Sequence, residues 1–265
     1  MRQTARQGKL KREAWEEQVT QLMIDGATRR GHLQTLVSPD CLRDVDFKAA
    51  ELLASGFSLA ELRSGNYLAA ELRAIGIKAA DAGKAGYTAR ELKGGGYSAA
   101  ALKAAAFTAA QLKAGGFVAK QLKAVGFAPD ELKANGFSAR ELREGSFTAK
   151  DLKPFFSVLD LRVAGFSSKA MKQVSYTLAE LKSGGYTATE LREASYGATE
   201  MKNAGFIAVE LKQAGYSGSE LRLAGFTAVE MREAGFNAKR LKQAAYSAAE
   251  LDETGWSVEV LKNAG

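Results

Sequence analysis

The chain has 265 residues, with 37 Lys and Arg against 30 Asp and Glu, and a formal net charge of +7 at pH 7. Its one cysteine (Cys41) excludes an internal disulfide, and with one histidine (His32) it cannot assemble a Cys/His zinc site of the usual kind. No apolar run approaches the roughly 18 residues that a transmembrane helix needs, so no transmembrane segment is expected.

The first 36 residues lie outside the pattern that organises the rest of the chain. Residues 10–25 carry Trp15, Val19, Leu22 and Met23 at helical spacing, which predicts an amphipathic helix. We expect the segment 1–36 to cap the first repeat. Five cations without an acid in the first twelve residues leave organelle targeting open. Because three glutamates follow and the apolar core of a secretory signal is missing, a cytoplasmic location is favoured.

From Val37 to Gly265 the sequence repeats every ten residues, in 23 units of which one has nine residues. Nearly every unit begins with Phe or Tyr, and 21 of the 23 aromatic residues in the chain occupy this first position. The consensus is aromatic-Ser/Thr-Ala-x-Glu-Leu-Lys/Arg-x-Ala/Gly-Gly. So short and regular a period predicts a tandem-repeat architecture over 37–265.

Each unit has the signals of a miniature capped helix. The second residue is Ser, Thr, Asn or Gly in 17 of 23 units, as an N-cap should be, and an acid follows three positions later in 16. The tenth residue is glycine in 15 units, where a left-handed residue can end the helix. Because isolated helices below roughly 12 residues are marginal in water, the units must pack on one another through Leu and the aromatic residue. The sequence therefore predicts an all-α solenoid of about 23 short capped helices.

A β-helix similar to that of pentapeptide-repeat proteins is the alternative fold, because aromatic and Leu residues alternate every five positions. That fold wants a small residue two positions before each inward side chain, whereas this chain has Arg90, Lys120 and Asp130 there. The abundant Ala, Leu, Glu, Lys and Gln also favour helix over strand.

Two interior units depart from the consensus. The unit that begins at Ile77 has Ala82 in place of Leu and Gly83 in place of the cation. The nine-residue unit carries Pro154 and Phe155 in place of its small C-terminal pair. We expect weak or bent interfaces at both, with a hinge or local change of curvature near 154–156 within the irregular region 147–156.

The last unit, residues 256–265, completes the repeat without a polar cap, although solenoids usually need one for solubility. Val258 and Val260 replace the usual Ala and Glu. Unless the chain is truncated, this pattern predicts an end-on contact through Trp256, Val258, Val260 and Leu261, either with a partner or with a second copy joined end to end.

The sequence offers no recognisable catalytic centre. One histidine cannot complete a Ser/His/Asp or Cys/His arrangement, and Gly94, Gly95 and Gly96 fall at a repeat boundary instead of in a phosphate-binding loop. Helix capping accounts for the recurrent Glu residues. We therefore expect a protein that is not an enzyme and needs neither cofactor nor metal.

The most regular surface feature is the residue after Leu, which is Lys or Arg in 20 of 23 units. With the Glu two positions earlier, these cations predict a solvated, charge-balanced face. The balance fails over residues 86–128, where six cations and one acid give a net charge of +5. The six cations of this basic strip are Arg90, Lys93, Lys103, Lys113, Lys120 and Lys123. Such a strip suits RNA or another polyanion, an acidic protein or an anionic membrane surface.

The unit Phe-Thr-Ala-x-Glu-Leu-Lys-x-Ala-Gly resembles the ten-residue tandem repeats of long, uncharacterised repeat proteins, and the likeness covers residues 37–265. It differs from the longer ankyrin, HEAT and tetratricopeptide units. The resemblance implies no activity, cofactor or site residue. The sequence favours a non-enzymatic scaffold for protein–protein interaction. RNA or polyanion binding through residues 86–128, and a self-assembling structural element, are the alternatives.

Overall fold

The computed structural model describes residue 43 and residues 47–264, so the predicted cap at 1–36 lies outside the described residues. The chain divides into two compact units, residues 1–136 and 137–265. All regular structure in the described residues is helical and none of it is strand. The all-α prediction is confirmed there, and the β-helix alternative is wrong.

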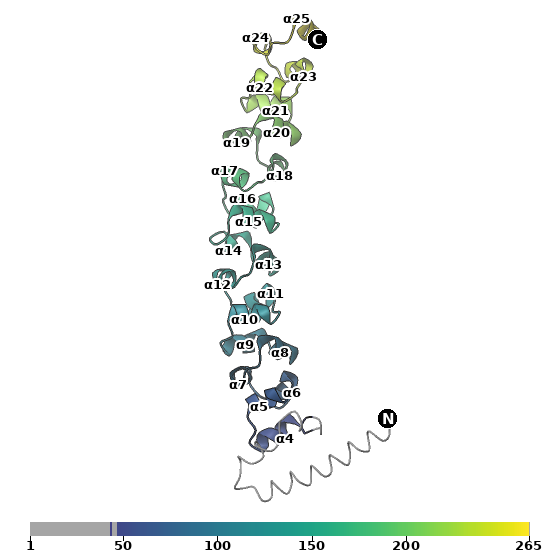
Figure 1. The fold of residues 1–265 in the computed structure, drawn as a ribbon. Coiled ribbons are helices and arrows are strands. Elements are labelled where there is room, and N and C mark those ends of the chain that lie inside the picture. Colours follow the sequence, from purple (N-terminus) through teal and green to yellow (C-terminus); the bar gives the residue numbers. More distant parts are fainter. Residues whose placement is uncertain (1–42, 44–46, 265) are drawn as a thin grey trace, which may run out of the picture. The chain divides into compact units, whose positions relative to one another are not determined.

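The described residues form 22 short helices, spaced about ten residues apart (Figure 1). The first unit contains α4 (Ala49–Ala54), α5 (Leu59–Ser64), α6 (Ala69–Ala74), α7 (Ala79–Lys84), α8 (Ala89–Gly94), α9 (Ala99–Ala104), α10 (Ala109–Ala114), α11 (Ala119–Ala124) and α12 (Pro129–Ala134). The second contains α13 (Ala139–Glu144), α14 (Ala149–Leu152), α15 (Val158–Val163), α16 (Ser168–Gln173), α17 (Leu178–Ser183), α18 (Ala188–Glu193), α19 (Ala198–Asn203), α20 (Ala208–Gln213), α21 (Gly218–Leu223), α22 (Ala228–Glu233), α23 (Ala238–Gln243), α24 (Ala248–Asp252) and α25 (Val258–Asn263).

The predicted capping box starts half of these helices, and α18 shows it fully. Thr187 is extended, and its hydroxyl oxygen accepts the Glu190 backbone N–H at 3.3 Å. In return, the Glu190 carboxylate accepts the Thr187 backbone N–H at 2.7 Å and its hydroxyl at 2.9 Å. Two unpaired donors of the first turn are satisfied in this way, which lets so short a helix begin at a defined residue.

A Schellman motif ends each typical helix, and α17 is an example. The N–H of Gly185 donates to the Lys182 carbonyl at 2.9 Å, and the N–H of Tyr186 donates to the Leu181 carbonyl at 3.0 Å. Tyr186 is also the residue just before the N-cap of α18. One aromatic residue therefore closes a helix and precedes the next, so the linker needs only four residues.

The left-handed conformation at the tenth position is confirmed. It is adopted by 14 glycines and also by six other residues. These six are Asn66, Ala106, Ser146, Ser175, Ser195 and Ala245. Side chains with a Cβ pay for positive φ with steric strain, so these six repeats end less favourably than the others.

We expect Ala106→Gly and Ala245→Gly each to raise the free energy of unfolding by about 0.5–1 kcal/mol, because glycine relieves the strain at φ +61° and +68°. Urea denaturation followed by circular dichroism measures the change. The matched reverse variant is Gly136→Ala, at φ +83° with no neighbouring atom within 4 Å, which should lose a similar amount through backbone strain alone. Equal stability of all three variants and the parent would contradict the assignment.

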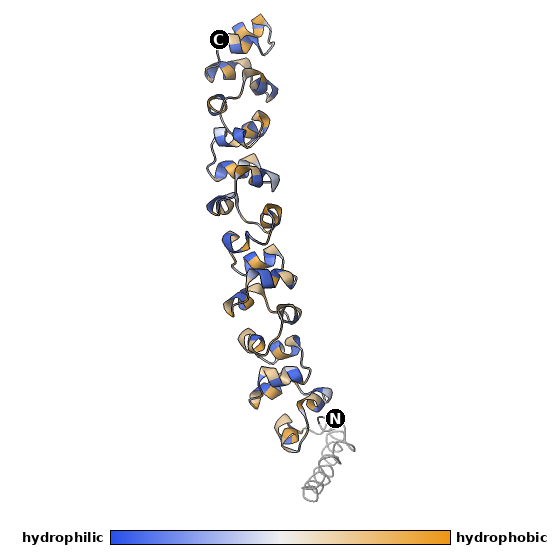
Figure 2. Cartoon of the chain, turned by 90° about the vertical axis from the view of Figure 1, so that its left-hand side faces the viewer, coloured by the Kyte–Doolittle hydropathy of each residue, from blue (hydrophilic) through white to orange (hydrophobic). Residues whose placement is uncertain are grey.

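The helices pack mainly on the helix after next. In the first unit α6 packs on α8 and α8 on α10, and in the second α18 packs on α20 and α20 on α22. Even-numbered and odd-numbered helices therefore form two stacks within each unit. The short helices carry hydrophilic and hydrophobic residues side by side (Figure 2).

The predicted core residues fill the stacks. The sixth residue of the repeat is completely buried in most units, for example Leu62, Leu132 and Leu191 at 0% exposure. The aromatic anchors are also mostly buried. Small residues allow close approach, because a Cβ on Gly95 would lie only 2.6–2.7 Å from atoms of Ala69 and Ala70. Leu and aromatic side chains thus fill the space between the helices, and Ala and Gly let the backbones of neighbouring helices approach closely.

The nine-residue unit differs locally. Its helix α14 has only four residues, and the N–H groups of Phe155 and Phe156 both donate to the Leu152 carbonyl, at 3.0 and 3.1 Å. No left-handed residue separates α14 from α15. The missing residue of this unit is therefore the one that ends other helices. A hinge near 154–156 stays a prediction.

Candidate functional site

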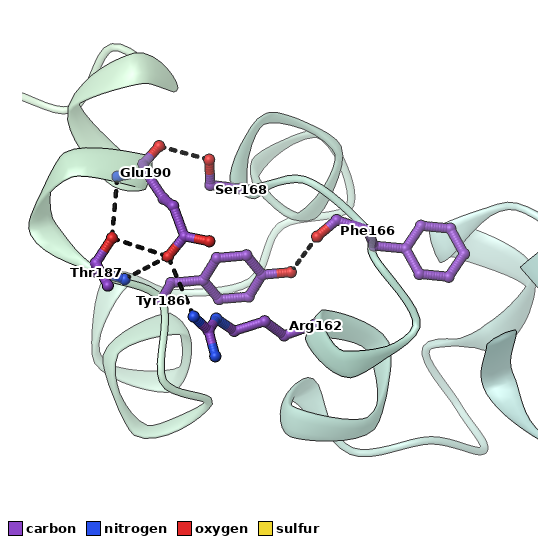
Figure 3. Close-up of polar contacts among 6 residues, drawn as sticks. All are labelled: Arg162, Phe166, Ser168, Tyr186, Thr187 and Glu190. Carbon is purple, nitrogen blue, oxygen red and sulfur yellow. Dashed lines mark hydrogen bonds and ion pairs between the residues drawn. The ribbon is translucent and has the colours of Figure 1, made fainter.

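The charged residues of the repeat form a polar site that recurs along each unit, here called the cross-repeat site. It consists of the cation after the buried Leu, the aromatic ring 23 or 24 residues later, and the capping Glu that follows that ring (Figure 3). Its members come from three helices or their ends, because helices pack on the helix after next.

The cross-repeat site at Arg162 shows the arrangement. Arg162 lies in the last turn of α15, and its guanidinium carbon is 5.7 Å from the centre of the Tyr186 ring. Its Nη2 lies 3.5 Å from Oε2 of Glu190, the carboxylate that caps α18. The Tyr186 hydroxyl donates to the Phe166 carbonyl at 2.6 Å (Figure 3). The cation, the ring and the carboxylate thus connect α15 with the end of α17 and the start of α18 in the second unit.

The contact repeats with a nearly constant sequence offset. The cation–ring pairs are Arg43–Tyr67, Arg63–Tyr87, Lys93–Phe117 and Lys103–Phe127 in the first unit. In the second unit they are Arg143–Phe166, Lys153–Tyr176, Arg162–Tyr186, Lys172–Tyr196, Lys182–Phe206, Arg192–Tyr216, Lys202–Phe226, Lys212–Phe236, Arg222–Tyr246 and Arg232–Trp256. The offset falls from 24 to 23 where the nine-residue unit intervenes.

Many of these cations also bind the carbonyl groups that end a helix. The Lys212 ammonium donates to the carbonyls of Ala234 and Gly235, at 2.9 and 2.7 Å, just beyond the end of α22. The Lys103 ammonium donates to the Val125 carbonyl at 2.9 Å beyond α11. A cation near the negative end of a helix is stabilising, so each of these cations helps to end the second helix after its own.

The electrostatics of the site follow from this geometry. Burial, with the Glu190 charge second, raises the pKa of Tyr186 to about 12. Burial alone would raise the pKa of Glu190 as well. The hydrogen bonds from Thr187 and the Arg162 guanidinium outweigh that effect and hold the pKa of Glu190 below its usual value. The carboxylate thus stays ionised and the phenol stays protonated near neutral pH.

The prediction of a solvated row of cations is therefore wrong in one respect. The cations are partly exposed, but they are engaged in contacts inside the repeat array. Because the repeat places a ring at nearly every tenth residue, no sequence signal shows which ring each cation contacts. Gly83 marks the exception: a Cβ there would lie 2.8 Å from the Phe107 ring, so the ring occupies the space beside the missing cation.

The basic strip of residues 86–128 separates into two kinds of cation. Lys93, Lys103 and Lys113 donate to helix-end carbonyls in the first unit, and Lys123 in the same repeat position is half-buried. Arg90 and Lys120 are exposed, at the fourth position of their repeats. Arg90 also donates to the Ala114 carbonyl at 3.2 Å. Three of the six, Lys93, Lys103 and Lys113, thus bind helix-end carbonyls two helices further along the chain, whereas Arg90 and Lys120 are exposed.

The residues of the predicted end-on contact lie at and near α25. Val258 and Val260 are 65% and 44% exposed, whereas Trp256 and Leu261 are half-buried. The Arg232 guanidinium lies 5.8 Å from the centre of the Trp256 ring. Helix α25 buries none of its described side chains completely. Contact of this face with a partner or a second copy stays a prediction.

Sequence reasoning missed a set of exposed aliphatic side chains in the second unit. They occupy the fourth or eighth position of the repeat, where polar or small residues are more usual. They are Leu159, Val163, Leu223 and Val229, with Leu223 the most exposed at 85%. The signal was an aliphatic residue at a variable repeat position.

The described residues offer neither a metal-binding cluster nor a membrane-spanning helix. Among them, no group of three or more His, Cys, Asp or Glu side chains is placed to hold a metal ion. No helix within residues 47–264 combines the length and the apolar character needed to cross a membrane. His32 and Cys41 lie outside the described residues.

Comparison with known proteins identifies the repeat. A family model described as a decapeptide repeat region matches residues 37–94, 86–155, 156–228 and 206–265. No curated protein and no solved structure matches the chain.

Proposed function

The chain belongs to the decapeptide repeat family, and from this premise we propose that it is a non-enzymatic scaffold that binds a protein partner. The observation that carries the proposal is that different positions of the repeat have different roles. Consensus cations, acids and aromatic residues bind one another across layers, so they build the array. Recognition is then left to the exposed fourth and eighth positions, which vary from repeat to repeat.

The aliphatic residues at those positions are the proposed contact residues. Leu223 and Val163 are 85% and 61% exposed, and both replace the polar or small residue of other repeats. Apolar side chains held on short rigid helices suit the binding of an elongated protein segment. Each side chain can bury apolar area against the partner, and the scaffold loses little conformational entropy on binding because its helices are already ordered.

The test compares partner capture by the parent and by the double variant Val163→Gln/Leu223→Gln. Glutamine occupies the same repeat position at Gln173, Gln213 and Gln243, so the variant is compatible with the fold. The amount of a discrete protein captured by crosslinking is quantified for both chains. We expect it to be at least tenfold lower with the double variant, whereas the urea midpoint of the double variant should equal that of the parent. The control Asn203→Gln, at the same repeat position, should retain capture. Equal capture by the double variant would contradict the assignment of these residues.

RNA or polyanion binding is the second candidate, favoured by the net charge of +5 over residues 86–128. The structure changes the residues to test, because reversing Lys103 or Lys113 would also remove a contact inside the array. Arg90→Glu/Lys120→Glu spares Lys103 and Lys113, but it removes the Arg90 hydrogen bond to the Ala114 carbonyl, so an unchanged urea midpoint is the required control. Salt-dependent binding of mixed RNA that this variant abolishes would favour the second candidate over the protein scaffold.

A further inference from the structure

Three cross-repeat sites in the second unit lack their acid, and one of them has a cation in its place. The capping acid is replaced in several described repeats, by Ala101, Gln111, Gln121, Ala170, Arg240 and Val260. Five of these changes only remove a negative charge. Arg240 alone among them adds a positive one, in α23 opposite Lys212.

Lys212 and Arg240 line the same groove. Its wall includes Tyr216, Ser217 and Ser219 from the start of α21, and its volume is about 480 Å³. Phe236, whose ring centre lies 4.9 Å from the Lys212 ammonium, is also at the groove surface. Two cations and two serines thus border one concave surface, and the Ser217 hydroxyl oxygen also accepts the Glu220 backbone N–H at 3.2 Å.

A twin of this groove shows what the consensus acid does. The groove at Lys182 has a volume of about 470 Å³ and is lined by the equivalent Tyr186, Thr187 and Phe206. There the carboxylate of Glu210 also lines the groove, with Oε2 at 3.7 Å from the Lys182 ammonium. The twin therefore contains an internal anion beside its lysine. At Lys212 a groove of matching size has a second cation in that place.

Hydrogen-bond donors remain in the groove at Lys212. An ammonium has three donors, and Lys212 directs two of them to the Ala234 and Gly235 carbonyls. The Arg240 side chain is exposed, whereas its backbone groups are engaged: the N–H donates to Asn237 Oδ1 at 2.9 Å, and the carbonyl accepts the Ala244 N–H at 2.9 Å. The nearby Glu220 is not a lining residue, and its carboxylate accepts the Ser217 backbone N–H at 2.7 Å.

We propose that this groove binds a phosphate monoester in its dianionic form. A guanidinium engages phosphate oxygens through two parallel hydrogen bonds, and the lysine supplies a second charge-assisted bond. A monoester carries a charge of about −1.5 to −2 at pH 7, which balances the two cations. A carboxylate or a phosphodiester carries one negative charge and leaves one cation uncompensated.

The experiment uses the full chain and three small probes, O-phosphoserine, dimethyl phosphate and acetate, titrated by calorimetry at pH 7.5 and low salt. We expect one phosphoserine per chain, bound at least tenfold more tightly than either monoanion. Arg240→Glu restores the consensus acid next to Asn237 and should weaken phosphoserine binding at least tenfold. Phosphoserine binding should also weaken as the pH falls below about 6, where the second phosphate proton returns.

The twin groove supplies a gain-of-function control. Glu210→Arg removes the internal anion at Lys182 and installs the missing cation, so we expect a second phosphoserine site per chain. The affinities for a phosphoserine peptide and for glycerol 3-phosphate are then compared. Tighter binding of the peptide would indicate a phosphorylated protein as the ligand, and tighter binding of glycerol 3-phosphate would indicate a small phosphate ester.

Three results would overturn the proposal: unchanged binding by Arg240→Glu, dimethyl phosphate binding as tightly as phosphoserine, or many equivalent weak sites per chain. None of these measurements involves the protein partner, so the outcome is independent of the scaffold function.

Discussion

Leu191→Ala is expected to lower the free energy of unfolding by about 2–5 kcal/mol, because the side chain is completely buried and its loss leaves a cavity. Leu191 lies in α18, which packs on α16 and on α20. The six-residue helix has little stability of its own, so its neighbours hold it in place. Urea denaturation followed by circular dichroism measures the loss.

Leu223→Ala is the matched control, since it makes the same chemical change at a side chain that is 85% exposed. It should change stability by less than about 0.5 kcal/mol. Amide hydrogen exchange adds a spatial test. In Leu191→Ala, exchange should accelerate in α16, α18 and α20 more than in α22 and α24, because stability in a repeat array depends on neighbouring layers. Equal losses in the two variants would show that α18 is not anchored by its leucine.

Alkaline pH should destabilise the protein through three buried tyrosines. Burial is the main cause that raises the pKa of Tyr87, Tyr186 and Tyr246, each from 10.0 to about 12. In an unfolded chain these phenols would titrate near 10. Their contribution to stability is therefore fully present below pH 10 and is lost as the pH rises through 12.

The structural reason lies in the hydroxyl groups. The Tyr87 hydroxyl donates to the Tyr67 carbonyl at 2.8 Å, and the Tyr186 hydroxyl donates to the Phe166 carbonyl at 2.6 Å. An ionised phenol has no proton to donate, and its charge would lie buried beside a carbonyl oxygen. The unfolded state thus releases its protons first and gains population.

The measurement is the urea midpoint at pH 8, 10, 11 and 12, together with tyrosinate absorbance at 295 nm. The triple variant Tyr87→Phe/Tyr186→Phe/Tyr246→Phe should be less stable at pH 8, by about 1–2 kcal/mol for each lost hydrogen bond. Its stability should nevertheless decline less steeply from pH 10 to 12. Lysine titration affects parent and variant alike, so parallel curves would exclude the tyrosines as the cause.

Local signals explain how much of the site could be predicted. Thr187, Glu190 and Gly185 have roles that act within ten residues, so their spacing specified the capping box and the helix end. The same local reasoning placed Lys103 on a solvated face and assigned it to a basic strip. Its contacts with Val125 and Phe127 lie more than twenty residues away, and nothing inside one unit reveals them.

The sequence by itself determined the period, the short capped helices, their left-handed ends and the Leu and aromatic core. Each of these depends on backbone and side-chain preferences within one unit. The tertiary structure decided that helices pack on the helix after next, which pairs Tyr186 with Phe166. It also brings Arg162 of α15 to Glu190 in the first turn of α18, three helices further along the chain. The physical reason is that nearly identical units offer nearly identical surfaces. Only the direction in which each four-residue linker turns the chain selects the unit that a side chain meets.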